Sequence, residues 1–244
     1  TTTYGVTADL AGCVATDNVV ITVNASPIVT DLADQEACDT YTLPVITGTN
    51  LTGNEGYFPL TNGGGVEVAA GTPITSTTTL FIYDETGTVP NCTSEESVTI
   101  TINTTPVVTD LADQEACDTY TLPAITGTNL TSNAGYFPLT NGGGTEVAAG
   151  TPITTTTTTL FIYDETGTVP NCTSEESVTV TINTSPVVAD LVDQEACDTY
   201  TLPAITGTNL TGNAGYFPLT NGGGVEVAAG TPITSTTTLF IYDE

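Results

Sequence analysis

The stretch "TTLFIYDETGTVPNCTSEESVTITI" (residues 78–102) contains a short apolar run, "LFIY" (80–83), and a run in which apolar and polar residues alternate, "VTITI" (98–102), separated by a turn with Gly, Pro and Asn. Alternation with a period of two places every second side chain on one face of an extended strand. The stretch therefore predicts strands at residues 78–83 and 98–102, whose apolar faces contribute to a β-sheet core.

The same pattern recurs along the chain at spacings of 79 and 80 residues. The sequence "TGTVPNCTSEESVT" starts at positions 86 and 166, and "DQEACDTYTLP" starts at 34, 113 and 193. We therefore divide the chain into full repeats at 26–104 and 105–184 and an incomplete repeat at 185–244. Residues 1–25 form the C-terminal part of a diverged repeat, and both ends of the chain are expected to be cuts in a longer protein.

Residues 1–25 keep the alternation although most of their letters differ from the other repeats. We align "TTTY" (1–4) with "TTTL" (77–80) and, after a turn three residues shorter, Cys13 with Cys92. Three apolar positions then stay in phase, with Val19, Ile21 and Val23 over Val98, Ile100 and Ile102. A strand that faces a core requires this conservation of phase.

Each full repeat is predicted to be all-β, because no segment has helical periodicity. Residues 34–40 are expected as a turn, after which Tyr41 and Leu43 enter the core. Six or seven short strands in about 80 residues are typical of an immunoglobulin-like β-sandwich, and near-identical copies indicate tandem domains, like beads on a string. The other strands expected in the first full repeat lie at residues 28–32, 41–46, 57–60 and 66–69.

The composition excludes several partners. The 244 residues contain no Lys, Arg or His and 28 Asp and Glu, which gives a formal charge of -28. Nucleic acid is excluded because no phosphate would be neutralised, and no apolar run approaches the roughly 18 residues of a membrane span, so no membrane insertion is expected. The expected partners are neighbouring repeats. Lateral self-assembly is an alternative, since Thr-rich edge strands without Lys lack one protection against edge pairing.

Four acids around the first "DQEACD" are candidate ligands for calcium, which binds clustered carboxylate oxygens. The spacing of an EF-hand is absent, so solvated acids in a loop are the alternative, and no other cofactor is expected. The four residues are Asp31, Asp34, Glu36 and Asp39.

No catalytic site is predicted, and the chain is expected not to be an enzyme. The carboxylate pairs Asp84–Glu85 and Glu95–Glu96 are adjacent in sequence, and neighbours on a strand point to opposite faces. The "NGGG" segment (62–65) lacks the Lys-Ser/Thr of a phosphate loop and predicts a tight turn. The Thr runs (75–79, 154–159 and 234–238) predict ordinary strands or a flat hydroxyl-rich surface that could bind ice or glycan.

Six cysteines without a CxxC motif or a histidine indicate disulfides, and hence a compartment outside the cytoplasm. Loop closure favours partners within one repeat, because nearby residues meet most readily. That rule predicts the bonds Cys38–Cys92 and Cys117–Cys172 and leaves Cys13 and Cys197 to pair outside the chain.

The expected topology favours a different bond. In an immunoglobulin-like sandwich the first turn and the last hairpin turn lie at opposite ends of the domain, about 20 Å apart, whereas bridged Cα atoms lie within about 7 Å. Cys38 would then bond Cys172 of the next repeat. A third possibility is Cys92–Cys117. It belongs to a set that pairs all six cysteines, each with a partner 25 residues away. The three alternatives stay open from the sequence.

Two segments resemble a known family. The sequence "TTTYGVTADLAGCVATDNVVITVNASP" (1–27) resembles the closing strands of PKD-like or immunoglobulin-like repeats in giant surface proteins of Bacteroidota. "CDTYTLPAITGTNL" (117–130) looks like a flavobacterial version of the same repeat, and the resemblance extends over the whole chain. It implies export by type IX secretion, a place on the bacterial cell surface, and membership of an adhesin, a filament or the gliding-motility machinery.

The sequence and the resemblance together lead us to expect the non-enzymatic shaft of an extracellular bacterial adhesin or filament. The alternatives are an extender that calcium makes rigid and an adhesive module that binds glycans.

Overall fold

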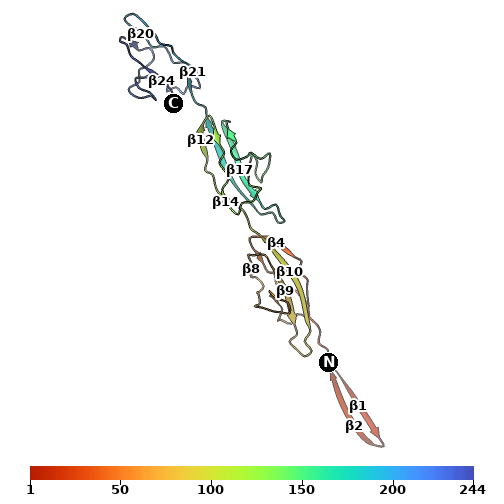
Figure 1. Ribbon diagram of the computed structural model, residues 1–244. Coiled ribbons are helices and arrows are strands. Elements are labelled where there is room, and N and C mark those ends of the chain that lie inside the picture. The colour runs from red at the N-terminus through yellow and green to blue at the C-terminus, as the bar shows by residue number, and fades with distance from the viewer. The chain divides into compact units, whose positions relative to one another are not determined.

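The computed structural model describes all 244 residues, and all of its regular elements are β-strands (Figure 1). Residues 1–25 form a hairpin of β1 (Thr2–Leu10) and β2 (Cys13–Ile21). The first full repeat contains β3 (Ile28–Val29), β4 (Gln35–Cys38), β5 (Tyr41–Thr42), β6 (Gly48–Thr49), β7 (Gly56–Phe58), β8 (Pro73–Ile74), β9 (Thr78–Glu85) and β10 (Thr93–Asn103).

The same order of strands returns in the second full repeat. Its strands are β11 (Val107–Val108), β12 (Gln114–Cys117), β13 (Tyr120–Thr121), β14 (Gly127–Thr128), β15 (Gly135–Phe137), β16 (Pro152–Ile153), β17 (Thr157–Glu165) and β18 (Thr173–Asn183). Residues 185–244 contain β19 (Val187–Val188), β20 (Tyr200–Thr201), β21 (Gly207–Thr208), β22 (Gly215–Phe217), β23 (Pro232–Ile233) and β24 (Phe240–Tyr242). The prediction of an all-β chain of repeated sandwiches is confirmed.

In the first full repeat, a four-stranded sheet is ordered β4-β10-β9-β7. The two strands predicted from residues 78–102 are its centre, β9 and β10, which pair in antiparallel with Val98 opposite Leu80. Two small pairs, β3–β6 and β5–β8, complete the repeat. The core packs between the pairs and the sheet, and its buried members are Val29, Leu43, Tyr57, Leu80, Ile82, Val98 and Ile100.

Five sequence predictions need correction here. The strands expected at 28–32 and 57–60 end early, at Val29 and Phe58. The turn expected at 34–40 contains strand β4, which pairs in parallel with the end of β10. The strand expected at 66–69 is reduced to one bridge, between Val68 and Tyr57, and Val66 is exposed. The strand expected at 41–46 ends at Thr42, because Pro44 has no amide hydrogen for a ladder. Leu43 enters the core as predicted, whereas Tyr41 is half-buried at its edge.

The "NGGG" segment forms the predicted tight turn. Asn62 and Gly63 both have positive φ, at 55° and 65°, the combination found in type I′ turns. Gly63 lies against the ring of Tyr83, where an added Cβ would come within 2.8 Å of a ring carbon. The turn therefore packs against the Tyr83 ring without side-chain bulk.

The hairpin β1–β2 pairs residues that the sequence alignment places over paired residues of β9 and β10. Tyr4 lies opposite Val19 in the hairpin, as Leu80 lies opposite Val98 in β9–β10. Unlike β9 and β10, both strands of the hairpin are exposed along their whole length.

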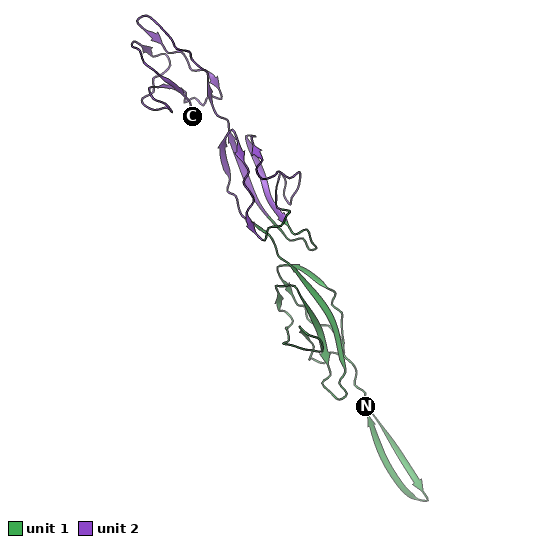
Figure 2. Cartoon of the chain, viewed as in Figure 1, with its two compact units in different colours: residues 1–107, 129–133, 165–174 green, residues 108–128, 134–164, 175–244 purple.

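Packing divides the chain into two compact units (Figure 2). Unit 1 contains residues 1–107, 129–133 and 165–174, and unit 2 contains residues 108–128, 134–164 and 175–244. Unit 1 thus includes two loops that belong, by sequence, to the second full repeat. The domain boundaries drawn from the repeats stay a prediction. No helix in the chain is long and apolar enough to span a membrane.

The core of the first full repeat depends on the inner face of β10. We expect Ile100→Ala to lower the free energy of unfolding of this repeat by about 2–5 kcal/mol, because Ile100 is fully buried and its removal leaves a cavity. Urea titration followed by tyrosine fluorescence measures the change. The control Val45→Ala, at a position 78% exposed, should change it by less than about 0.5 kcal/mol; equal effects of the two variants would contradict this core.

Candidate functional site

Strand β4 determines where Cys38 lies. Its parallel pairing with β10 places Cys38 opposite Asn103, the last residue of β10. Asp39 continues the contact by donating its backbone N–H to the Asn103 carbonyl at 2.9 Å. Cys92 immediately precedes the first residue of β10, and an 11-residue strand is about 35 Å long. Cys38 and Cys92 therefore lie at opposite ends of one strand.

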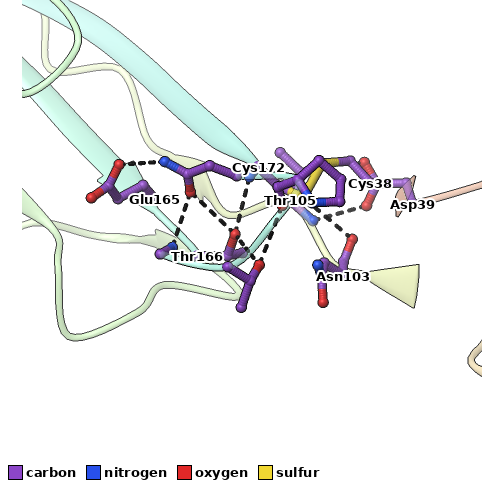
Figure 3. The surroundings of a disulfide bond; sticks show 11 residues. Cys38, Asp39, Asn103, Thr105, Glu165, Thr166 and Cys172 are labelled. Carbon is purple, nitrogen blue, oxygen red and sulfur yellow. Dashed lines mark hydrogen bonds between the residues drawn. A yellow bond between two sulfur atoms is a disulfide. The ribbon is translucent and has the colours of Figure 1, made fainter. Parts of the chain in front are cut away.

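Cys38 forms a disulfide with Cys172, 134 residues further along the chain, with the two Cα atoms 5.7 Å apart (Figure 3). Cys92 is a half-buried free thiol, and Cys13, Cys117 and Cys197 are exposed free thiols. The pairings Cys38–Cys92 and Cys117–Cys172 are thus not those of the structure, and Cys92–Cys117 is not formed either. Loop closure favoured the nearer partners, but the length of β10 keeps them apart.

The segment that carries Cys172 is held by its own hydrogen bonds. The Cys172 backbone N–H donates to Thr166 Oγ1 at 3.0 Å, and the Thr166 N–H donates to the Cys172 carbonyl at 3.0 Å. Asn171 Oδ1 accepts from the Gly167 N–H at 2.9 Å, and Asn171 Nδ2 donates to the Glu165 carboxylate at 2.5 Å. Cys172 is only 2% exposed, so its sulfur is placed in a fixed and dry position.

Asn103 lies directly beside the disulfide (Figure 3). Its carbonyl oxygen is 3.7 Å from Cys172 Sγ, and the same oxygen accepts the Asp39 N–H. Its Nδ2 is buried without a hydrogen-bond partner. The end of β10 is therefore enclosed by residues of two sequence repeats.

Asp39 also holds the segment that follows β10. Its backbone has a φ of 60°, in the left-handed region that Asp adopts more readily than most residues. The carboxylate accepts the Thr105 N–H at 2.9 Å and the Thr105 hydroxyl at 2.6 Å. The hydroxyl first, and then the amide, hold the pKa of Asp39 below its usual value.

The corresponding contact recurs in the second full repeat. The carboxylate of Asp118 accepts the Ser185 N–H at 2.9 Å and the Ser185 hydroxyl at 2.6 Å, and these bonds lower the pKa of Asp118. In both cases an Asp that follows a Cys binds the hydroxyl residue that precedes a Pro. Sequence reasoning missed this pair, although its two halves recur together in the repeat.

The four candidate calcium ligands do not converge. Asp34 accepts the Thr99 N–H at 2.7 Å, and Asp39 is bonded to Thr105. Asp31 and Glu36 are exposed, and no group of three or more His, Cys, Asp or Glu side chains is arranged to hold a metal. Two of the four acids thus secure backbone donors instead of forming a shared oxygen site.

Three of the four acids weighed as catalytic pairs, Asp84, Glu85 and Glu95, accept hydrogen bonds from the backbone or from neighbouring side chains. Asp84 is fully buried and accepts both the N–H, at 3.0 Å, and the hydroxyl of Thr52. Glu95 accepts the Asn62 N–H of the "NGGG" turn. Glu85 accepts from the Tyr83 hydroxyl at 3.1 Å and from Asn91 Nδ2 at 2.8 Å. These carboxylates fix loops against the sheet.

No known protein family matches the chain, and no curated protein is similar to it in sequence. Among solved structures, mouse cadherin-23 EC22-24 is 12% identical, with 88% of this chain and 90% of that chain covered and a TM-score of 0.31. Protocadherin gammaB7 EC3-6 is 13% identical over 97% and 77%, with a TM-score of 0.35. Sidekick-1 immunoglobulin domains 1-4 are 11% identical over 99% and 82%, with a TM-score of 0.28.

Thr105→Ala tests the contact with Asp39. The variant keeps the Thr105 N–H but loses the hydroxyl that does most to lower the pKa, so the pKa of Asp39 should rise toward its usual 3.8. Because the folded pKa is depressed, the contact stabilises the protein fully above that usual value, and the stabilisation is lost as the pH falls through the lowered pKa. Carboxyl ¹³C NMR titration measures the pKa of Asp39. The pKa of Asp118, bonded to Ser185, is the internal control and should stay unchanged; an unmoved Asp39 would contradict the assignment.

Proposed function

We propose that this chain is a non-enzymatic shaft segment of an extracellular surface protein, in which covalent and polar contacts link consecutive repeats to each other. The observation that carries the proposal is the Cys38–Cys172 bond, because its two cysteines belong to two different sequence repeats. A bond that only stabilised one small domain would join residues of the same repeat.

The segments between repeats support the same function. Thr105 and Ser185 each stand immediately before the proline of a junction, and each is bonded through both its amide and its hydroxyl. Proline limits the backbone further by fixing its own φ. Short segments restrained in this way suit a shaft better than a flexible tether, for which Gly and Ser without such bonds are typical.

The roles of the acids support a non-enzymatic function. Asp84 and Glu95 each accept a backbone N–H of a loop, so these carboxylates take part in the fold. A net charge of -28 keeps such a surface solvated and makes copies repel one another. Lateral self-assembly would then need cations between copies.

A place on the bacterial cell surface, export by type IX secretion and a role in adhesion or gliding are proposed from the resemblance of residues 1–27 and 117–130 to Bacteroidota repeats. The glycan-binding alternative depends on outward Thr hydroxyls such as those of Thr79 and Thr99, which lie 3.3 Å apart. Because these two hydroxyls bond each other, a structural role accounts for them.

Immunogold electron microscopy of the organism that makes this protein tests the location. Antibodies against residues 26–184 should label intact cells along surface projections, and deletion of residues 105–184 should bring a label placed beyond them closer to the cell. Labelling that appears only after the cells are made permeable, or a label distance that the deletion leaves unchanged, would overturn the shaft.

Calcium binding is the alternative that the charge favours, since 28 acids face no basic side chain. If the shaft needs no metal, millimolar CaCl₂ should change the melting temperature of the oxidised chain by no more than about 1 °C relative to the same concentration of MgCl₂, which controls for charge screening. Excess EDTA should then leave the melting temperature unchanged. A calcium-specific rise that EDTA reverses would establish the calcium-dependent extender instead.

A further inference from the structure

The Cys38–Cys172 bond is a covalent shortcut in the chain. It joins positions 134 residues apart, so residues 39–171 form a closed loop between the two cysteines. We propose that a pulling force applied along the chain crosses this bond and bypasses the loop, so that the protein resists lengthening when it is pulled. The inference deepens the proposed shaft function and rests on it for its biological meaning.

Most of the core of the first full repeat lies inside the loop. Leu43, Tyr57, Ile82 and Ile100 all fall between the two cysteines in sequence, as do β5 through β10. In a chain without the bond, the force would act on these strands, and each residue that unfolded would add about 3.3–3.6 Å of length. With the bond, these residues have no tension across them.

The segment that carries the force after the bond is already extended. Thr173, the residue after Cys172, is the first residue of the 11-residue strand β18. A β-strand rises about 3.3 Å per residue, which is close to the maximum reach of a chain. Pulling from Cys172 toward Asn183 therefore gains almost no length from this segment.

The segment before the bond is equivalent by sequence repeat. Cys13 begins strand β2 and Cys38 ends strand β4, and they are 25 residues apart, as are Cys172 and Cys197. Each 25-residue segment begins with a long strand, β2 or β18, and continues through the prolyl junction that follows it. On either side of the disulfide, the path of force thus begins with two similar segments, each of which contains a long strand and a prolyl junction.

Both cysteines of the disulfide lie in backbone that hydrogen bonds fix in place. Cys38 is opposite Asn103 in the parallel ladder, and Cys172 is buried and bonded to Thr166 through its own N–H and C=O groups. Force that enters at either sulfur meets backbone already fixed by hydrogen bonds.

Single-molecule force spectroscopy on the full 244-residue chain, held by tags at its two termini, measures the path directly. The fully stretched, oxidised chain should reach a contour length of roughly 370 Å, against roughly 830 Å after reduction with dithiothreitol, at about 3.4 Å per residue. Cys38→Ser should give roughly 830 Å without reductant, a length that does not depend on whether the variant folds.

Cys117→Ser is the matched control, because Cys117 occupies the position of Cys38 in the next repeat but is a free thiol. It should keep the length of roughly 370 Å. Equal lengths for the oxidised chain and Cys38→Ser would overturn the proposal. So would an oxidised length of roughly 460 Å that increases in Cys117→Ser, the result expected for the bonds Cys38–Cys92 and Cys117–Cys172. The measurement uses the isolated chain, so its outcome is separate from that of the surface labelling.

Discussion

The parallel pairing of β4 with the last four residues of β10 is the constraint on which the other features of the site depend. It places Cys38 opposite Asn103, at the far end of an 11-residue strand from Cys92. From that position the sulfur reaches Cys172 of the next sequence repeat. The same pairing brings Asp39 within hydrogen-bond distance of Thr105, just after β10. A four-residue strand thus determines both the covalent bond and the polar contact at the junction.

A chain without basic side chains has no ion pairs to organise its acids, and their partners here are backbone amides and hydroxyls. Asp34, Asp39, Asp84 and Glu95 each accept at least one backbone N–H. Hydrogen bonds from neutral donors to an ionised carboxylate are stronger than those between neutral groups. The acidic composition is therefore compatible with a well-ordered fold, because several carboxylates accept hydrogen bonds from loop N–H groups that would otherwise lack a partner.

The fold was predictable from the sequence because its signals are local and repeated. The apolar run 80–83 and the alternation in 98–102 identified β9 and β10, and the alignment of residues 1–25 with 77–102 matches the pairing found in the hairpin β1–β2. Strand β4 was missed because "QEAC" has only two small apolar side chains, Ala37 and Cys38, and lies between Asp34 and Asp39, so that it resembles a turn. The disulfide was undecided because loop entropy and strand length favour different partners, and only the position of β4 relative to β10 separates them. The calcium cluster was not formed because local backbone donors took up two of its acids.

The interchangeable junction contacts have a consequence for the gene as well as for the protein. Asp39 binds Thr105 with the same geometry with which Asp118 binds Ser185, and the residues that flank both junctions are nearly identical. Unequal recombination between such near-identical coding repeats inserts or removes a whole repeat and recreates the same contact at the new boundary. The number of repeats is then free to change in evolution in steps of about 80 residues without a new interface having to be invented.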